Sequence, residues 1–443
     1  MSTLGLTTLR RTLLVLAWAS LAGAETIALV GGTVHPVSGP AIQEATVVIQ
    51  DGKILAVGAA IVLPAGARVV SVAGKHVYPG YLSADSVLGL TEVAAVAATN
   101  DFAEIGDINP NVRAEVALNP DSDLIPVARV NGVTSVHAIP RGGLVAGTSA
   151  VYRLDGWTYE DMTVRAPVGL HVRWPRMTPQ RGPRVTQSDE DQKKTRDQAM
   201  DGIRRAFEEA RAYGAARAAE GQTGIPRHDR DVKWDAMTKA LRGEIPVFFH
   251  AKALGQIRAA LRFADEQKLR KLVIVGGADA WRIGDELRAR DVAVITAAPT
   301  DLPSRRDAPY DESFALPARL EAAGVRYCIG DGGGTDSAAN ARNLPYLAAQ
   351  AMGFGLTPEQ ALRAITLSAA EVLGVADTLG SIDVGKSADL FVADGDPLEL
   401  NTRIEAVYIA GKAVSLETRQ TRLFDRYDKR PRGPKARPRP ATP

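Results

Sequence analysis

The sequence of 443 residues contains a single cysteine, Cys328. One cysteine cannot form an intramolecular disulfide, so covalent cross-linking within the chain is excluded. Cys328 lies in the apolar run 325–330, "VRYCIG". An apolar setting of this kind favours a buried thiol over a nucleophile, because burial disfavours the thiolate.

Long hydrophobic runs are also missing. A membrane-spanning helix needs about 20 apolar residues, and the N-terminal apolar run 13–19 is too short for one. That run follows Arg10 and Arg11 and precedes the small residues 22–24, which is the pattern of a secretory signal peptide cleaved after residue 24. We therefore expect a soluble protein exported across the inner membrane to the periplasm. The Sec pathway is expected, with twin-arginine export as the alternative.

No charge sign predominates, since 53 Lys and Arg oppose 51 Asp and Glu. Binding of nucleic-acid phosphates requires a concentrated basic surface, so no nucleic-acid partner is expected. The expected partner is a small-molecule substrate, and a homo-oligomer is left open. Basic residues concentrate only in the proline-rich C-terminal segment, and we expect residues 421–443 to be disordered.

Apolar and polar residues alternate near both ends of the chain, which predicts strands. Between two such runs, Asp51-Gly52 indicates a hairpin, because glycine tolerates the positive φ of a tight turn. The same alternation returns after residue 381. We expect residues 25–77 and 381–420 to form one composite β-sandwich domain.

Strand-like and helix-like segments take turns from residue 78 to residue 380. The strand candidates are 77–84, 132–140, 245–251, 271–277, 292–299 and 325–331, and the helix candidates include 192–221, 254–269 and 357–374. This order predicts an α/β fold, a TIM-like (β/α)8 barrel with a parallel sheet. Residues 171–192 interrupt it with proline and charge, so we interpret them as a surface insertion.

Several stretches resemble the amidohydrolase superfamily, in particular its imidazolonepropionase-like and dihydroorotase-like members. They are "GGTVHPVSG", "IQDGKILAVG", "GKHVYPGYLSAD", "NGVTSV", "VFFHA", "GLTPEQALRAITLSAAEVLGV" and "LGSIDVGKSADLFVADGDPLE". Their order and spacing cover nearly the whole predicted mature chain. The resemblance implies a metal-dependent barrel beside a β-sandwich built from both chain ends, and hydrolysis of C–N bonds.

The family's first-strand pattern implies a His-x-His pair of metal ligands where this chain has Asp85 and Val87. Valine has no lone pair, so one ligand is lost. Asp85 either ligates through oxygen or accepts hydrogen bonds from loop amides. Because it ends a strand, where barrel active sites are assembled, it remains a candidate catalytic residue.

The resemblance implies three further site positions. His250 matches the fifth-strand metal ligand, and Gly276 or Gly277 replaces the next strand's histidine, which removes a ligand and leaves space. The strand-8 catalytic aspartate, which takes up and delivers the proton, corresponds to Asp331 or Asp336. Strand-end geometry favours Asp331, which is also the second candidate metal ligand beside His250.

These residues imply a reduced metal site, with one weakly bound zinc, manganese or magnesium ion or with none. One hypothesis is an exported hydrolase that cleaves cyclic amides or small peptide-like substrates with metal-activated water. A second is metal-free hydrolysis by Asp85 and Asp331 as an acid/base pair. The third is a secreted binding or scaffold protein that has kept the barrel and lost catalysis.

Overall fold

The computed structural model describes residues 25–430 apart from 223, 225, 226, 228, 304 and 306. The predicted signal peptide, residues 1–24, and residues 431–443 of the predicted tail lie outside the described residues. No helix in the described part of the chain is long and apolar enough to cross a membrane.

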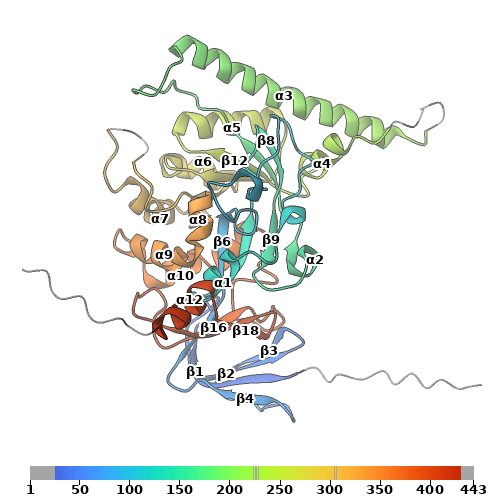
Figure 1. Ribbon diagram of the computed structural model, residues 1–443. Helices are drawn as coiled ribbons and strands as arrows, with labels where there is room; N and C mark the ends of the chain where they lie inside the picture. The colour runs from blue at the N-terminus through green and yellow to red at the C-terminus, as the bar shows by residue number, and fades with distance from the viewer. Residues whose placement is uncertain are drawn as a thin grey trace, which may run out of the picture.

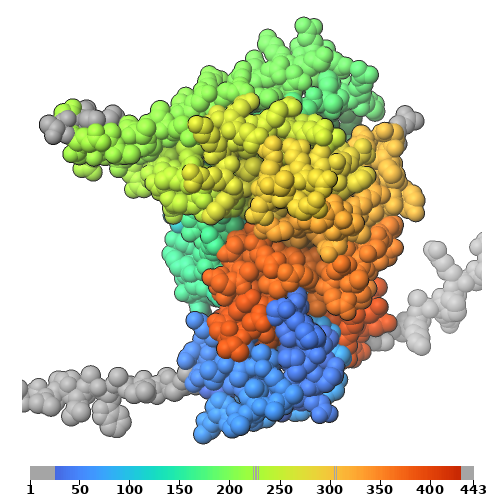
Figure 2. All heavy atoms as spheres, turned by 180° about the vertical axis from the view of Figure 1, so that it is seen from behind, coloured from blue at the N-terminus to red at the C-terminus, as the bar shows by residue number. Residues whose placement is uncertain are grey.

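Strands from both ends of the chain form one eight-stranded sheet, at the bottom of Figure 1. Its strands are β1 (Ile27–Val34), β2 (Ile42–Gln50), β3 (Lys53–Gly58), β4 (Arg68–Ser71), β5 (His76–Pro79), β16 (Leu390–Ala393), β17 (Ile404–Ile409) and β18 (Lys412–Val414). The order is β18-β17-β16-β5-β1-β2-β3, and β4 pairs with β1. The predicted hairpin at Asp51-Gly52 joins β2 to β3, and both turn residues have positive φ. Figure 2 shows from behind how the two chain ends pack together.

The middle of the chain forms two further sheets. One has the order β10-β9-β7-β6 and the other β15-β14-β13-β12-β11-β8. Their strands are β6 (Tyr81–Ser86), β7 (Val133–Ala138), β8 (Val145–Thr148), β9 (Ala150–Arg153), β10 (Thr163–Arg165), β11 (Leu170–Arg173), β12 (Val247–Ala251), β13 (Leu272–Gly276), β14 (Ala293–Thr296) and β15 (Tyr327–Cys328). Strands β11 to β15 are parallel, and β6 is parallel to β7.

The helices alternate with these strands, and α3 crosses the top of Figure 1. They are α1 (Leu124–Arg129), α2 (Tyr159–Met162), α3 (Asp189–Ala219), α4 (Val232–Leu241), α5 (Leu254–Glu266), α6 (Gly284–Ala289), α7 (Glu312–Ala322), α8 (Thr335–Ala339), α9 (Leu344–Met352), α10 (Pro358–Ala364), α11 (Leu367–Val372) and α12 (Arg419–Asp428).

The strands have two different apolar faces, because successive side chains point to opposite sides. On β12, Val247 and Phe249 pack in the large core that includes the helices, whereas Phe248 belongs to a second core. That second core is made by strand residues, including Cys328, and by α11. Cys328 is buried and free, as predicted. The second core marks an inner face, away from the outer helices.

Three predictions about local structure are wrong in part. Residues 170–173 form β11, so the predicted surface insertion at 171–192 begins inside the sheet. The predicted helix 357–374 is two helices, since α10 ends at Ala364 and α11 begins at Leu367. The predicted disorder from residue 421 overlaps α12, because proline, which excludes helix, first occurs in this segment at residue 431.

Strand pairing among the described residues forms two separate sheets in this region and no closed ring. The edge strands β6 and β15 do not pair with each other, but hydrogen bonds outside the strand ladders link the regions around them. The Leu82 amide donates to the Ile365 carbonyl, and Ser83 bonds to Asp331 just after β15. The closure of the eight-stranded barrel and the sandwich arrangement therefore remain predictions.

Candidate active site

Three histidines occupy the inner faces of neighbouring strands. On β7, β11 and β12 the flanking residues face the outer core, so His137, His171 and His250 point to the opposite side. The rings of His137 and His171 lie 5.6 Å apart, and those of His171 and His250 lie 5.2 Å apart. The fold therefore brings three of the six histidines into one row.

Hydrogen bonds within the protein occupy this row. His137 Nδ1 lies 2.8 Å from the Ala84 carbonyl, and its Nε2 lies 2.7 Å from Ser149 Oγ. His171 Nδ1 and His250 Nε2 share a bond of 3.0 Å. Burial lowers the pKa of His137 to about 4, and burial first, then neighbouring charges, holds the pKa values of His171 and His250 well below the usual range. All three imidazoles are neutral at pH 7.

Two carboxylates lie at the ends of β6 and β15. Asp331 is buried; its Oδ2 accepts from Ser83 Oγ at 2.9 Å and its Oδ1 from the Gly333 amide at 3.1 Å. Asp85 is also buried and forms an ion pair with the guanidinium of Arg141. Asp85 thus pairs with an arginine rather than with the loop amides that the sequence suggested.

The electrostatics of Asp331 set it apart from other carboxyl groups. Burial raises its pKa to about 7, and the negative charge of Asp85 contributes in the same direction. The hydrogen bonds from Ser83 and Gly333 and the charge of Arg141 oppose this rise. Asp331 therefore changes its protonation state near neutral pH, as a general acid or base must.

Arg141 connects the two parts of the site. It pairs with Asp85, and its charge lowers the pKa of both His250 and Asp331. Its backbone is fixed on both sides, since its amide donates to the Phe102 carbonyl at 2.6 Å and its carbonyl accepts from Arg173 at 2.5 Å. Asp85, His250 and Asp331 consequently share one electrostatic environment.

Gly333 allows Arg141 to reach Asp85. A Cβ atom at this position would lie 1.5 Å from an Arg141 guanidinium nitrogen and 2.6 Å from Asp85 Oδ1. The residue also has a φ of +63°, which side chains rarely adopt. The glycine-rich loop after β15 thus makes room for the ion pair.

These donors do not fit a divalent metal ion. Zinc takes three or four unprotonated ligands aimed at one point, but His250 bonds to His171 and Asp85 pairs with a guanidinium. The charges of Arg141 and Arg173 would also repel a cation. Across the described ranges, no three His, Cys, Asp or Glu side chains form a group that could hold a metal.

The predicted site residues have different positions. Asp85, His250 and Asp331 come together around Arg141, whereas Asp336 is exposed in the first turn of α8. The space predicted at Gly276 and Gly277 is occupied. Cβ atoms there would lie 3.0 Å from Lys252 and 2.7 Å from Val294.

The sequence analysis missed His137, His171, Arg141 and Arg173. His137 follows the matching stretch "NGVTSV" directly, and this position was a usable signal. His171 lies in "GLHVR", which the structure shows as a short strand. The prolines that follow led us to interpret this segment as a surface insertion instead. Arg141 lies in a loop with no motif of its own, so only the three-dimensional structure reveals it.

Comparison with known proteins agrees with this architecture. The family model described as Amidohydrolase family matches residues 200–414. A solved structure of an amidohydrolase from Thermotoga maritima superposes with a TM-score of 0.78 at 26% identity, covering 88% of this chain and 99% of that one. The chain belongs to the amidohydrolase superfamily. The structural likeness implies a TIM-barrel-like fold for the α/β part.

Curated amidohydrolase relatives match in part. Amidohydrolase tasK of Hapsidospora irregularis is 26% identical over 376 residues, which is 79% of this chain. An imidazolonepropionase of Sphingopyxis alaskensis is 52% identical over 52 residues, 12% of this chain. The chain spans only 37% and 13% of the lengths of these two relatives.

Proposed function

We propose that this superfamily member is a hydrolase that cleaves C–N bonds in small amides, either cyclic or peptide-like. Superfamily membership supports the reaction class. The observation that carries the proposal is Asp331, a buried carboxyl with a pKa raised to about 7 beside the Asp85–Arg141 pair. We also propose export to the periplasm, on the basis of the N-terminal sequence pattern.

The described side chains support acid/base hydrolysis. The ionised Asp331 accepts a proton as water attacks the amide carbon, and then delivers it to the leaving nitrogen as the C–N bond breaks. The guanidinium groups of Arg141 and Arg173 supply positive charge for the oxygen that becomes negative in the transition state. Asp85 holds Arg141 in place, so its role is positioning.

The metal site of this protein is, in our proposal, degenerate. In the superfamily resemblance a divalent metal activates water, but here His250 is bonded to His171 and Asp85 is paired with Arg141, and His171 Nε2 is buried without a partner. At most one ion would bind, and weakly. The steps above therefore use only groups of the chain and the attacking water.

A specific observation favours a second candidate, a binding or scaffold protein without turnover. Both nitrogens of His137 and the facing nitrogens of His171 and His250 are already bonded within the protein. Such internal pairing stabilises a core as readily as it supports a site.

An assay of the purified mature protein against cyclic amides and dipeptides tests the two candidates. Hydrolysis should be lost in Asp331→Asn and kept in Asp336→Asn, an exposed aspartate five residues away in α8. Adding a chelator should leave the activity unchanged, and activity restored only by added metal would contradict the proposed chemistry. Ligand binding without turnover in the wild type would favour the binding protein.

A further inference from the structure

The last helix, α12 (Arg419–Asp428), carries large apolar side chains that stay partly exposed. None of its residues is buried. Leu423, Phe424 and Tyr427 have 37%, 69% and 49% of their surfaces exposed. Residues three and four positions apart share one side of a helix, so these three form a single apolar face. Figure 1 shows α12 at the edge of the molecule, near the eight-stranded sheet.

The helix is held in place near its first turn by polar contacts. Thr418 and Thr421 form a capping box that fixes its first turn. Arg419 bonds to Asp123, in the turn before α1, at 3.3 Å. Arg422 bonds to Glu417 at 3.4 Å. These contacts orient α12 without using the apolar residues.

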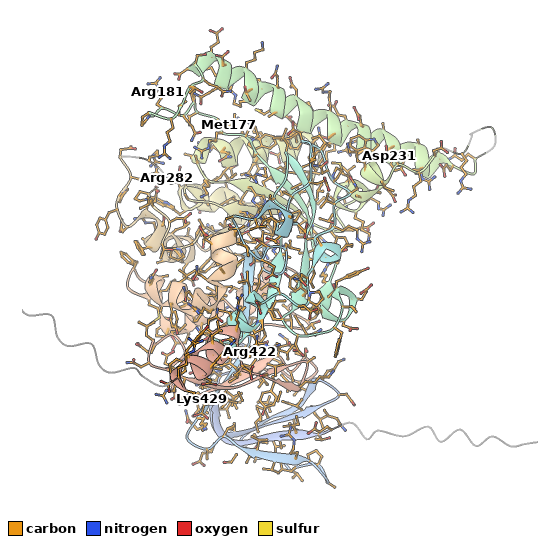
Figure 3. All side chains as sticks on the ribbon, in the orientation of Figure 1. Met177, Arg181, Asp231, Arg282, Arg422 and Lys429 are labelled. Atoms are coloured by element: carbon orange, nitrogen blue, oxygen red, sulfur yellow. The ribbon has the colours of Figure 1, made fainter. Side chains whose placement is uncertain are left out.

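Positively charged side chains lie beside this apolar face, although Asp425 and Asp428 also belong to the helix. The guanidinium groups of Arg426 and Arg430 lie 5.9 Å and 4.3 Å from the ring centre of Tyr427. Residues 419–443 contain nine Lys and Arg but only two Asp, a net charge of +7 in a chain whose total is +2. Figure 3 labels Arg422 and Lys429, which lie at the periphery of the molecule.

We propose that α12 binds the surface of a membrane that contains anionic phospholipids. Leu423, Phe424 and Tyr427 would enter the boundary between headgroups and acyl chains, while the surrounding arginines contact lipid phosphates. An amphipathic helix with a basic polar side and large apolar side chains has the chemistry of an interfacial anchor.

Electrostatic repulsion argues against two other occupants of the apolar face. A second copy would bring another α12 with the same positive charge, so like charges would repel. The segment 431–443 has four basic residues and no acidic one, and it would be repelled in the same way.

Co-sedimentation of the full mature protein with lipid vesicles tests this proposal. We expect binding to vesicles of phosphatidylglycerol and phosphatidylcholine and little binding to pure phosphatidylcholine. The double variant Leu423→Ser/Phe424→Ser should reduce the bound fraction about tenfold, and Arg426→Gln/Arg430→Gln should also reduce it. The matched control is Leu302→Ser, an exposed leucine between β14 and α7, which should bind like the wild type.

Each of the following three results would contradict the proposal. Wild-type protein that stays in solution with anionic vesicles would refute membrane binding. If both α12 variants bind normally while removal of residues 431–443 abolishes binding, the tail acts alone. If Leu423→Ser/Phe424→Ser instead abolishes a dimer seen without lipid by light scattering, the face joins two copies. Thermal unfolding of the variants should match the wild type, which separates lost binding from misfolding.

Discussion

The Ser83 hydroxyl donates a 2.9 Å hydrogen bond to Oδ2 of Asp331, although 248 residues separate them in the chain. Ser83 belongs to β6, the first strand of the α/β part, and Asp331 follows β15, the last. This bond and the Gly333 amide lower the pKa of Asp331 against the larger effect of burial. The pKa of Asp331, the proposed acid/base group, thus depends on contacts between the ends of the first and last strands.

Stability should depend on the protonation of Asp331. Its pKa rises from 3.8 to about 7 on folding, so the folded state binds the proton more tightly. The contribution to stability is complete below pH 3.8 and is lost as pH rises to about 7, by at most about 1.4 kcal/mol per pH unit. Urea unfolding from pH 4 to 8 should show this loss in the wild type and Asp336→Asn but not in Asp331→Asn. Identical pH profiles for all three would refute the shift.

Substitution of Gly333 by alanine should disrupt the ion pair. The added methyl group would overlap the Arg141 guanidinium and approach Asp85, and the positive φ adds strain. We expect a loss of about 2–4 kcal/mol in the free energy of unfolding, measured in urea. Gly334→Ala is the control, because no atom lies within 4 Å of its added Cβ. Equal stability of both variants would contradict the described packing.

Replacing Arg141 by methionine should leave Asp85 buried without its partner. Breaking a buried pair costs about 3–5 kcal/mol, whereas Arg141→Lys, which keeps the charge, should cost less. The pKa of Asp331 should rise further, because Arg141 lowers it in the wild type. The midpoint of any pH–activity profile would therefore move upward in Arg141→Met. A midpoint that is the same in both variants would exclude this charge effect.

The purified protein should contain fewer than two zinc ions per chain and lose any metal on mild chelation. His250 is paired with His171 and Asp85 with Arg141, so few free ligands remain among the described residues. Elemental analysis of protein prepared without chelators measures the content, with His250→Ala prepared in parallel. Two tightly held zinc ions would show that the donors rearrange around metal.

Export can be tested independently of catalysis. The arginines and the apolar run that precede residues 22–24 predict cleavage there. N-terminal sequencing of the mature protein should begin at Glu25. Intact Met1 on soluble cytoplasmic protein would rule the prediction out.

The residues of the candidate site differed in how readily the sequence could identify them. Asp85, His250 and Asp331 were found because a strand end or a family motif marks each one. His171 was missed because three prolines between residues 175 and 183 suggested a surface loop, although the strand ends just before them. Proline content describes the segment as a whole, but moving its start from residue 171 to residue 174 decides whether the His171 side chain lies inside the protein.

Arg141 could not be predicted, because its importance arises from neighbours distant in sequence. Asp85 lies 56 residues before it, and Gly333 lies in the loop after the last parallel strand. The choice between Asp331 and Asp336 followed strand-end geometry rather than motif wording, and the structure places only Asp331 next to Ser83. Similarly, alternation at both chain ends was enough to predict strands there, but not the order in which these strands pair.

The pairing of β5 with β16 sets the order in which the molecule can be assembled. Residues 76–79 bond to residues 390–393, so one edge of β5 has no partner until almost the entire chain has been synthesised. An open edge of this kind invites pairing with other chains. The sheet can therefore be completed only once residues 390–393 have emerged, and a nascent chain needs protection from aggregation while the more than 300 intervening residues emerge.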